Sequence, residues 1–346
     1  MSEELKPIQA EEKPPVEPIL DVAPSPHIYD TSLTTRKVML DVLIALVPLV
    51  VWSIFMFRLY AVKQLGISIV ACLAFETLFA KMRGRSTPIG DYSAAITGVI
   101  LGLSLPATTP VFINIIAAGV AIGIGKAVFG GLGFNMFNPA MVGRAFVMLS
   151  FARWLGAPAY VDESLGVDAL TRATPLSVAK DFMKMVFDGQ MGFRDLVEVA
   201  DQDLFMGYVN GSLGEMSALC ILIGGLYLIY RKAAAWQIPL GSIVGLLVSA
   251  LILNLLNLTP YDMMQHLWSG AFLFGAFFIA TDPVSSPLSR KGRFFFGLGY
   301  GVLVMILRVF SSYPEGVMFA ILIMNAMVPL INRFSVPVPL GGPTQV

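Results

Sequence analysis

Charge is scarce in this chain of 346 residues: only 13% of them are Asp, Glu, Lys or Arg, while 56% are hydrophobic. Soluble domains carry about 25% charged residues, so half that fraction in so apolar a chain predicts a polytopic membrane protein. The 23 Lys and Arg residues match the 23 Asp and Glu residues. A formal net charge of zero argues against a nucleic-acid partner and leaves the lipid bilayer as the predicted surroundings.

Cysteine and histidine are nearly absent as well. Cys72 and Cys220 lie in separate apolar runs, where small core residues are expected. His27 and His266 are isolated from them and from each other. Without a CxxC pair or a Cys/His cluster, the chain offers no zinc or iron–sulfur site of its own.

Nucleotide-binding and hydrolytic motifs are missing too. The chain has no P-loop, no Rossmann fingerprint and no HExxH. A self-contained dehydrogenase or hydrolase is therefore not expected, and transport or redox chemistry on a bound cofactor is left. Residues 1–30 are rich in Pro, Glu and Lys and contain no apolar run, so they predict a cytoplasmic tail rather than a cleavable signal peptide.

Apolar runs long enough to cross a bilayer recur along the rest of the chain. A hydrocarbon core about 30 Å thick needs roughly 20 helical residues, and shorter runs predict tilted or half-crossing helices. The pattern predicts an all-α polytopic membrane protein with about ten transmembrane helices. The predicted spans are 38–57, 66–81, 89–105, 111–129, 138–155, 213–230, 237–256, 264–280, 294–310 and 316–332.

Lys and Arg residues orient these spans, because cytoplasmic loops carry an excess of them. Three gaps, 106–110, 257–263 and 311–315, contain neither residue. Basic residues instead occupy the alternate gaps and follow the last span: Lys81, Arg83, Arg85, Arg231, Lys232, Arg290, Lys291, Arg293 and Arg333. Among the short gaps on the other side, only the first contains any, Arg58 and Lys63. Both termini are therefore predicted in the cytoplasm of a bacterial cell, with the long gap 156–212 outside its inner membrane.

The same layout divides the chain into five parts. We expect a cytoplasmic tail (1–35), a first membrane repeat (36–155), an extracytoplasmic loop (156–212), a second membrane repeat (213–333) and a C-terminal tail (334–346).

Proline spacing predicts that the two membrane parts are inverted repeats of five spans each. Pro106 and Pro110 follow the third span, and Pro283 and Pro287 follow the eighth, 177 residues later. Such repeats often bring broken helices to a site at the membrane midplane. The alternative is that these prolines only mark helix ends. Glycine pairs four residues apart also predict tight helix packing. They are Gly119 and Gly123, Gly241 and Gly245, and Gly297 and Gly301.

The predicted outer loop contains DALTRATPLS at 168–177. Thr174 followed by Pro175 is a good start for a helix, since Thr caps helices and Pro fits the first turn. Leu176, Ala179 and Phe182 then fall on one face of an amphipathic helix. A helix start also favours an anion such as a phosphate on the Thr174 hydroxyl, although capping alone explains the residue.

This stretch resembles the flavin-attachment motif of the RnfD/NqrB family of membrane subunits. Asp168, Thr171, Ala173 and Thr174 match the family pattern, while Arg172 stands where the NqrB branch most often has Gly. The resemblance spans roughly 25–335. Its blocks are SPH at 25–27, GGLGFNMFNPAMVGRAF at 130–146, FFIATDPVSSP at 277–287 and SSYPEGVMFAILIMNAMVPLI at 311–331. The short N-terminal tail and ATPL at 173–176 are more similar to the RnfD branch.

The resemblance implies a subunit of an Rnf complex that is not catalytic alone. It would carry electrons through FMN esterified to Thr174 and take part in coupling ferredoxin/NAD electron transfer to Na⁺ or H⁺ translocation. Implied partners are other Rnf subunits, among them an extracytoplasmic flavin-bearing subunit and membrane iron–sulfur subunits, and an FMN transferase for maturation. The family also suggests a non-covalent riboflavin.

Two polar interruptions of the apolar spans are candidate walls of such a flavin site, because polar groups in a bilayer usually face a cavity or cofactor. One contributes Asn135, Asn138 and Arg144; the other contributes Thr281, Asp282 and Ser285. Helix capping at broken helices is the alternative reading.

Glu76 lies inside the second predicted span, and intramembrane acids are functional candidates. It belongs either to an ion path or to a contact with a polar group of a neighbouring helix. Two other overall readings stay open: an NqrB-like subunit of a quinone-reducing sodium pump, and a channel or transporter without a redox group.

Overall fold

The computed structural model describes residues 34–84, 89–155, 201–207, 211–311 and 315–335, together with six positions between 176 and 185. Within these residues every regular element is helical, as the all-α prediction requires. The first 33 residues of the predicted N-terminal tail, most of the predicted outer loop and nearly all of the C-terminal tail lie outside the described residues.

The described residues of the N-terminal half form six α-helices. They are α1 (Thr35–Phe57), α2 (Leu59–Met82), α3 (Ser93–Ser104), α4 (Val111–Ile122), α5 (Pro139–Ser150) and α6 (Ala152–Leu155). A 3₁₀ turn at Ile89–Asp91 precedes α3, and a π-helical segment at Gly123–Ala127 continues α4.

The C-terminal half begins with the short helix α8 (Asp201–Met206). It continues with α9 (Ala218–Tyr230), α10 (Gln237–Leu255), α11 (Met263–Trp268), α12 (Phe272–Phe274), α13 (Arg290–Phe310) and α14 (Val317–Ser335). A second π-helical segment, Gly275–Ile279, continues α12.

Five of these helices, α1, α2, α10, α13 and α14, are long and apolar enough to cross a membrane. Four shorter apolar helices lie at 93–104, 111–127, 139–150 and 218–230. A multi-pass membrane protein is thus supported, while the described residues do not confirm the count of ten spans. The predicted span 264–280 consists of α11, α12 and a π-helical segment, because the chain turns at Ser269 and Gly270 between them.

Helix α1 is apolar on all sides, which suits a helix with protein on one side and lipid on the other. Its inward face buries Leu46, Leu49 and Met56. Its outward face exposes Val51 and Phe55, the latter with 68% of its surface accessible. In water so much exposed apolar surface would be unfavourable, whereas in hydrocarbon it costs nothing.

The glycine pairs predicted from the sequence do mark close helix crossings. A methyl group on Gly245 of α10 would lie 2.3 Å from the Leu298 carbonyl oxygen of α13, and one on Gly301 would lie 2.2 Å from the Ser242 oxygen. Helices α10 and α13 therefore touch backbone to backbone. Gly119 and Gly123 instead lie against the rings of Phe75 and Phe79 of α2.

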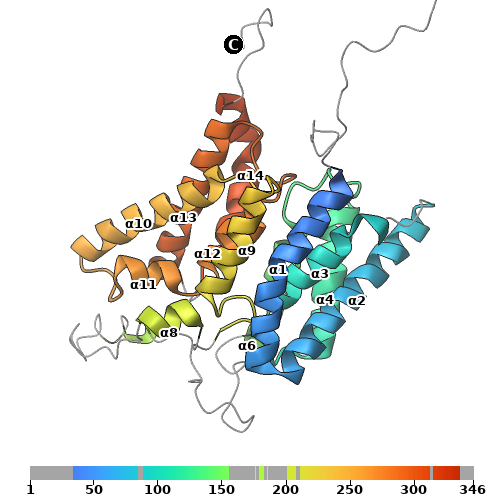
Figure 1. Ribbon diagram of the computed structural model, residues 1–346, viewed down its shortest axis with the longest axis horizontal. Coiled ribbons are helices and arrows are strands. Elements are labelled where there is room, and N and C mark those ends of the chain that lie inside the picture. The colour runs from blue at the N-terminus through green and yellow to red at the C-terminus, as the bar shows by residue number, and fades with distance from the viewer. Residues whose placement is uncertain are drawn as a thin grey trace, which may run out of the picture.

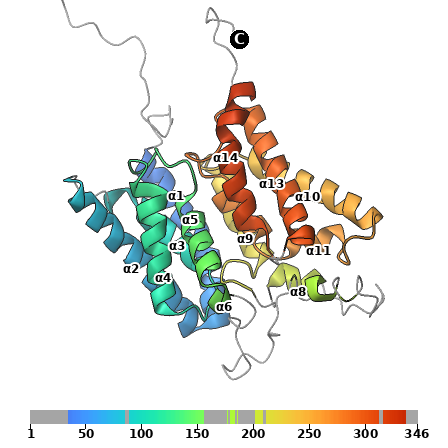
Figure 2. The ribbon, with the colours of Figure 1, turned by 180° about the vertical axis from the view of Figure 1, so that it is seen from behind.

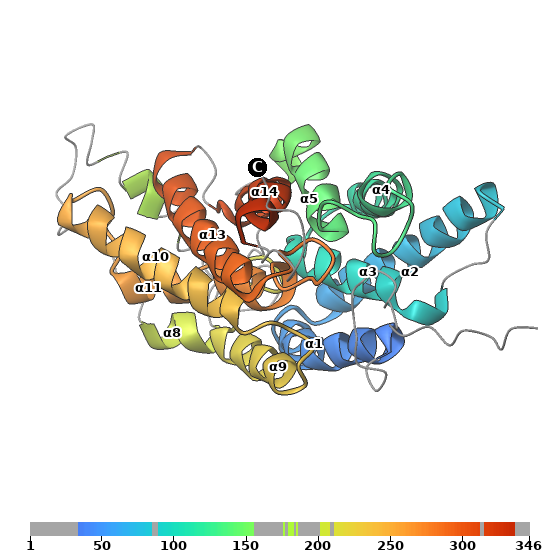
Figure 3. The same ribbon diagram turned by 90° about the horizontal axis from the view of Figure 1, so that it is seen from above.

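The two halves lie side by side. Helix α1 packs against α9 and α5 packs against α14, as Figure 3 shows from above. Within the halves, α2 packs on α3 and α4, and α10 packs on α11 and α13. Figures 1 and 2 show the start of α1 and the end of α14 at one end of the bundle, with α6 and α8 at the other.

Two irregular segments interrupt the bundle where the halves meet. We call residues 128–138, between the first π-helical segment and α5, the first break. Residues 280–289, between the second π-helical segment and α13, are the second break. These two breaks contain five of the six polar residues proposed from the sequence as flavin contacts.

Candidate functional site

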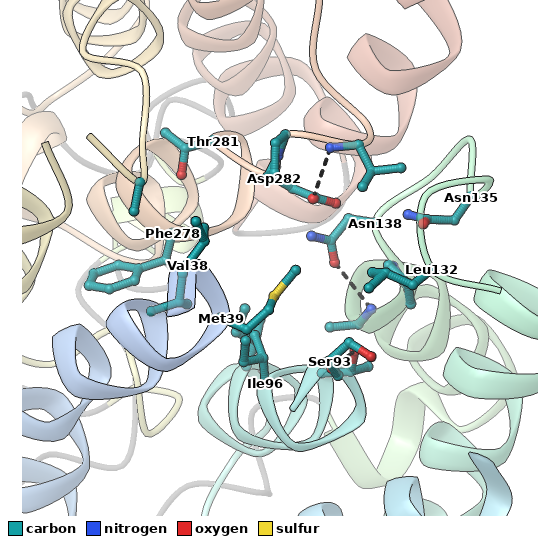
Figure 4. A pocket seen from close by; sticks show the side chains of 18 of the residues that line it. Val38, Met39, Ser93, Ile96, Leu132, Asn135, Asn138, Phe278, Thr281 and Asp282 are labelled. Carbon is teal, nitrogen blue, oxygen red and sulfur yellow. Dashed lines mark hydrogen bonds between the residues drawn. The ribbon is translucent and has the colours of Figure 1, made fainter. Parts of the chain in front are cut away.

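A cavity lies between the two breaks and the helices around them. Four of the proposed residues line it: Asn135, Asn138, Thr281 and Asp282. Figure 4 shows Val38 and Met39 of α1, Ser93 and Ile96 of α3, and Leu132 of the first break around the same space. The structure therefore brings these four residues from both polar interruptions to one cavity.

The cavity is small, with a volume of about 80 Å³. Sites for small organic ligands usually have volumes of about 300–1,000 Å³. The lining combines amide, hydroxyl and carboxylate groups with apolar side chains, which suits the polar edge and flat face of a flavin ring. The volume does not suit it: in this conformation the space is too small, and flexible side chains such as Met39 and Leu132 would have to move.

The polar groups of the first break also serve the local backbone. The side chain of Asn138 caps α5 by accepting hydrogen bonds from the backbone N–H groups of Ala140 (3.1 Å) and Met141 (3.4 Å). Asn135 donates from its amide to the Phe137 carbonyl oxygen at 3.1 Å. The capping explanation is thus correct for Asn138, whose side chain at the same time borders the cavity.

The second break is braced in a similar way. One Asp282 carboxylate oxygen accepts from the Val284 N–H at 3.2 Å, and the other accepts from the Ser285 hydroxyl at 3.0 Å. Thr281 donates to the Phe277 carbonyl oxygen at 2.6 Å. Ser285 therefore supports Asp282, while Asp282 and Thr281 reach the cavity.

Asn325 of α14 ties the two breaks together. Its side-chain oxygen accepts from the Asn138 N–H at 3.2 Å, and its amide donates to the Ser285 carbonyl oxygen at 2.9 Å. Asn325 has only 1% of its surface exposed. One buried side chain thus sets the spacing of the cavity's two polar walls.

Glu76 of α2 forms a buried ion pair with Lys126 of the first π-helical segment, and both side chains are 5% exposed. The Lys126 ammonium also donates to the Ser93 hydroxyl, which in turn donates to an Asp91 carboxylate oxygen at 2.6 Å. The contact to a neighbouring helix considered for Glu76 from sequence therefore exists. The second Glu76 oxygen, Oε2, is buried without a hydrogen-bond partner.

A second cavity adjoins this ion pair. It has a volume of about 340 Å³ and is lined by Glu76, Arg83, Asp91 and Lys126, among others. Lys126 lines both cavities. The second cavity is large enough for several water molecules, and its polar lining offers them hydrogen-bond partners.

Arg144 lies apart from the first cavity. Its guanidinium is 3.3 Å from a Glu215 carboxylate oxygen and 3.5 Å from a Glu315 carboxylate oxygen. Glu315 also accepts from the Ala271 N–H at 2.6 Å. Burial raises the pKa of the Glu315 carboxyl above its usual range, and the neighbouring Glu215 carboxylate adds to that rise. The structure thus gives Arg144 the role of joining the N-terminal half to two acidic residues of the C-terminal half.

The attachment motif, Asp168, Thr171, Arg172, Ala173 and Thr174, lies outside the described residues. Just after it, the described residues Leu176, Ala179 and Phe182 are helical and buried, as the amphipathic pattern predicted.

Leu176 and Ala179 cluster with Tyr261 of the C-terminal half. Lys180 of the same helix donates to the carbonyl oxygen of Ser311. The described part of this helix therefore lies against the C-terminal half.

Two residues of the site escaped the sequence reasoning. Lys126 is a lone basic residue in the apolar run AIGIGKAVFGG, and the high cost of an intramembrane charge is the signal that could have found it. Asn325 lies in the apolar run ILIMNAMV, but a single Asn does not reveal which backbone groups it reaches.

The comparison with protein families finds one matching model. The model described as the NQR2, RnfD, RnfE family matches residues 21–341, nearly the whole chain.

Individual relatives give the same picture. The chain is 38% identical to the D subunit of the proton-translocating ferredoxin:NAD(+) oxidoreductase complex of Clostridium ljungdahlii, over 93% of this chain and 96% of that protein. It is 37% identical to the D subunit of the Na(+)-translocating ferredoxin:NAD(+) oxidoreductase complex of Acetobacterium woodii, over 91% and 93%. It is 38% identical to the D subunit of the ion-translocating oxidoreductase complex of Halorhodospira halophila, over 92% and 94%.

Proposed function

The chain belongs to the NQR2, RnfD, RnfE family, and on that premise we propose that it is the D subunit of an ion-translocating ferredoxin:NAD oxidoreductase complex. The observation that carries the proposal is similarity over more than nine-tenths of the chain to subunits with that name. The sequence has no nucleotide-binding or metal-cluster motif of its own, so the chain acts as one part of an oxidoreductase rather than as an enzyme alone. The same relatives' names favour this reading over a quinone-reducing pump or a channel without a redox group.

We propose FMN, esterified through its phosphate to Thr174, as the electron carrier. A bound flavin supplies one- and two-electron transfer, and the chain supplies its position and surroundings. Support comes from the DALTRATPLS motif and from the helix that follows it, whose described residues pack on the C-terminal half. Asp168, Thr171, Arg172 and Ala173 complete the motif that an FMN transferase would recognise.

The test is denaturing gel electrophoresis of the complex, produced together with an FMN transferase and viewed under ultraviolet light. We expect a fluorescent band at the mass of this chain. The band should disappear in Thr174→Val and persist in Thr77→Val, which removes a threonine hydroxyl from α2, outside the motif. A wild-type chain without fluorescence, or a Thr174→Val chain that keeps it, would refute covalent attachment at Thr174.

The first cavity is our proposed place for a non-covalent riboflavin, once its side chains move apart. The carbonyl and amide groups of Asn135 and Asn138 and the polar groups of Thr281 and Asp282 would contact its edge, and Ser285 would support Asp282. Flavin released by acid from the purified complex should fall by one equivalent in Asn135→Leu. An unchanged flavin content would place the riboflavin elsewhere or exclude it.

We propose an inner-membrane protein with both termini in the cytoplasm and the flavin loop outside. Support comes from the Lys and Arg distribution and from the start of α1 and the end of α14, which share one end of the bundle (Figure 1). An impermeant thiol reagent should label a cysteine placed at position 170 from outside the cell, in a chain lacking Cys72 and Cys220. Labelling only after lysis would reverse the orientation.

The pairing of α1 with α9 and of α5 with α14 supports inverted repeats, because a two-fold relation between the halves brings equivalent helices together. Partners would be the flavin-bearing extracytoplasmic subunit and membrane iron–sulfur subunits of the complex.

We propose that Glu76 lies on the path of the transported ion. The relatives' names do not select the ion: one is called proton-translocating and another Na⁺-translocating, at 38% and 37% identity to this chain.

A further inference from the structure

The Glu76–Lys126 ion pair lies where two cavities meet. Lys126 lines the small cavity between the breaks and also the larger cavity that reaches Arg83. Glu76 lines only the larger one of these two. The Lys126 side chain therefore stands between the two spaces, with its ammonium on Glu76 and Ser93.

The ion pair with Lys126 leaves one carboxylate oxygen of Glu76 without a partner. This atom, Oε2, is buried and has no hydrogen-bond partner. The side chain as a whole is 95% buried and borders the larger cavity. A buried carboxylate oxygen without a partner is costly, and a cation is the partner that compensates it best. Asp91 offers a second carboxylate in the same cavity.

Each cavity is also bordered by carboxylates. Glu76 and Asp91 border the larger cavity, and Asp282 borders the smaller one together with Asn135 (Figure 4). Lysine carries its charge on a flexible four-carbon stem, so a rotation of that stem moves the charge by several ångströms. Lys126 also lies in a π-helical segment, a local irregularity that is frequent at functional sites.

We propose that Lys126 is a tethered cation that competes with the transported monovalent cation for Glu76. With Lys126 on Glu76, the passage between the cavities is closed. A cation that enters the larger cavity takes the Glu76 carboxylate, and the Lys126 ammonium turns into the smaller cavity toward Asp282 and Asn135. Charge is conserved at Glu76, because one cation replaces another there, and Asp282 gains the positive charge of Lys126. This inference rests on the proposed function, which supplies the ion transport.

The arrangement makes cation binding at Glu76 depend on the charge inside the smaller cavity. Negative charge added there attracts Lys126 and leaves Glu76 open to a cation; removal of that charge returns Lys126 to Glu76 and expels the cation. The charged groups that face the pair are Arg83 and Asp91 in the larger cavity and Asp282 in the smaller. Na⁺ and H⁺ both fit a carboxylate of this kind, so the experiment needs one arm for each.

The experiment uses the purified whole complex in lipid vesicles and measures ferredoxin-to-NAD electron transfer. One arm varies Na⁺ at fixed pH, and the other varies pH at fixed Na⁺. In Lys126→Gln the internal competitor is gone. We expect the Na⁺ concentration for half-maximal rate to fall at least about tenfold, or the pH profile to move upward by about one unit, as for a typical coupling between two ligands.

Three variants make the result specific. Lys126→Arg keeps the charge and should respond within about threefold of wild type, a change smaller than the roughly fivefold lower end of site-to-site coupling. Lys63→Gln removes an exposed charge from the same helix as Glu76 and should change nothing. The double variant Glu76→Gln with Lys126→Gln leaves no unpaired buried charge, so it should assemble even where the single variant does not. It should transfer electrons without a response to Na⁺ and with only the pH dependence that NAD reduction, which takes up a proton, imposes.

The proposed competition between Lys126 and the cation is refuted if assembled, active Lys126→Gln responds to both Na⁺ and pH as the wild type does. The same response in the double variant also refutes it. Failure of the proposed function looks different: the wild-type complex itself would then lack flavin fluorescence or ferredoxin-to-NAD activity.

Discussion

The two breaks border the same cavity but are built differently. The first break turns on three glycines with positive φ, Gly130, Gly131 and Gly133, and exposes Phe134. The second break has prolines at 283 and 287, and Asp282 holds it through bonds to Val284 and Ser285. Proline restricts φ and glycine frees it, so the second break is the stiffer of the two.

The two breaks also hold their charged groups differently. The Lys126–Glu76 pair lies beside the glycine-rich break, with one Glu76 oxygen unpartnered. Asp282 lies in the proline-rich break with both oxygens occupied by local donors. A flexible wall with a movable charge thus faces a stiff wall with a fixed charge, and Asn325 connects them.

Removing that connection should have the largest effect of the three changes considered for the breaks. Asn325→Ala leaves a buried N–H on the first break and a buried carbonyl on the second without partners, a loss of about 2–3 kcal/mol. Heating the detergent-solubilised complex and measuring its soluble fraction would show a lower midpoint. Asn332→Ala, on the same helix, removes only one exposed hydrogen bond, from the Leu288 N–H of the second break, and is the matched control. Equal midpoints for the two variants would show that Asn325 does not hold the breaks together.

A change in the first break, the flexible wall of the cavity, should have the second-largest effect. Gly131 has a φ of 113°, a conformation that L side chains rarely adopt, although nothing lies within 4 Å of the place for a Cβ. Gly131→Ala should therefore destabilise the complex by about 1–2 kcal/mol through backbone strain alone. Gly66→Ala, within helix α2 and also in open space, should be neutral or stabilising in the same assay. If Gly131→Ala behaves like Gly66→Ala, the first break does not need its glycine.

The smallest effect is expected from a change in the second break, the stiff wall of the cavity. Ser285→Ala removes one hydrogen bond to Asp282 while Val284 still donates to the carboxylate, so the loss should be about 1 kcal/mol. The midpoint should fall less than in Gly131→Ala, and flavin content should be unchanged. A larger fall than in Gly131→Ala would reverse the assignment of stiff and flexible walls.

Much of the membrane architecture could be predicted from sequence because the apolar pattern acts locally. Long apolar runs, flanking basic residues and glycine pairs each act within a few turns of helix, and α1, α10, α13 and α14 lie close to their predicted bounds. Helix α2 begins at Leu59, seven residues before the prediction, because Lys63 and Gln64 fit inside a helix that the hydropathy pattern alone excluded.

The candidate site was only partly predictable. Asn135, Asn138, Thr281 and Asp282 were recognised as polar groups out of place in apolar runs, and they do share a cavity. Arg144 was recognised in the same way, yet it binds Glu215 and Glu315 instead. Polarity in a membrane indicates that a side chain needs a partner, but not which partner.

The sequence by itself determined that this chain is helical and apolar, because hydrocarbon leaves the backbone no hydrogen-bond partners outside a helix. It also predicts an orientation from the placement of the basic residues. Its motifs also indicated the family. Only the tertiary structure decided that Lys126 meets Glu76 across 50 residues and that Asn325 joins breaks from both halves. Those contacts depend on how helices pack, and the packing of several helices sums many weak contacts that no local pattern records.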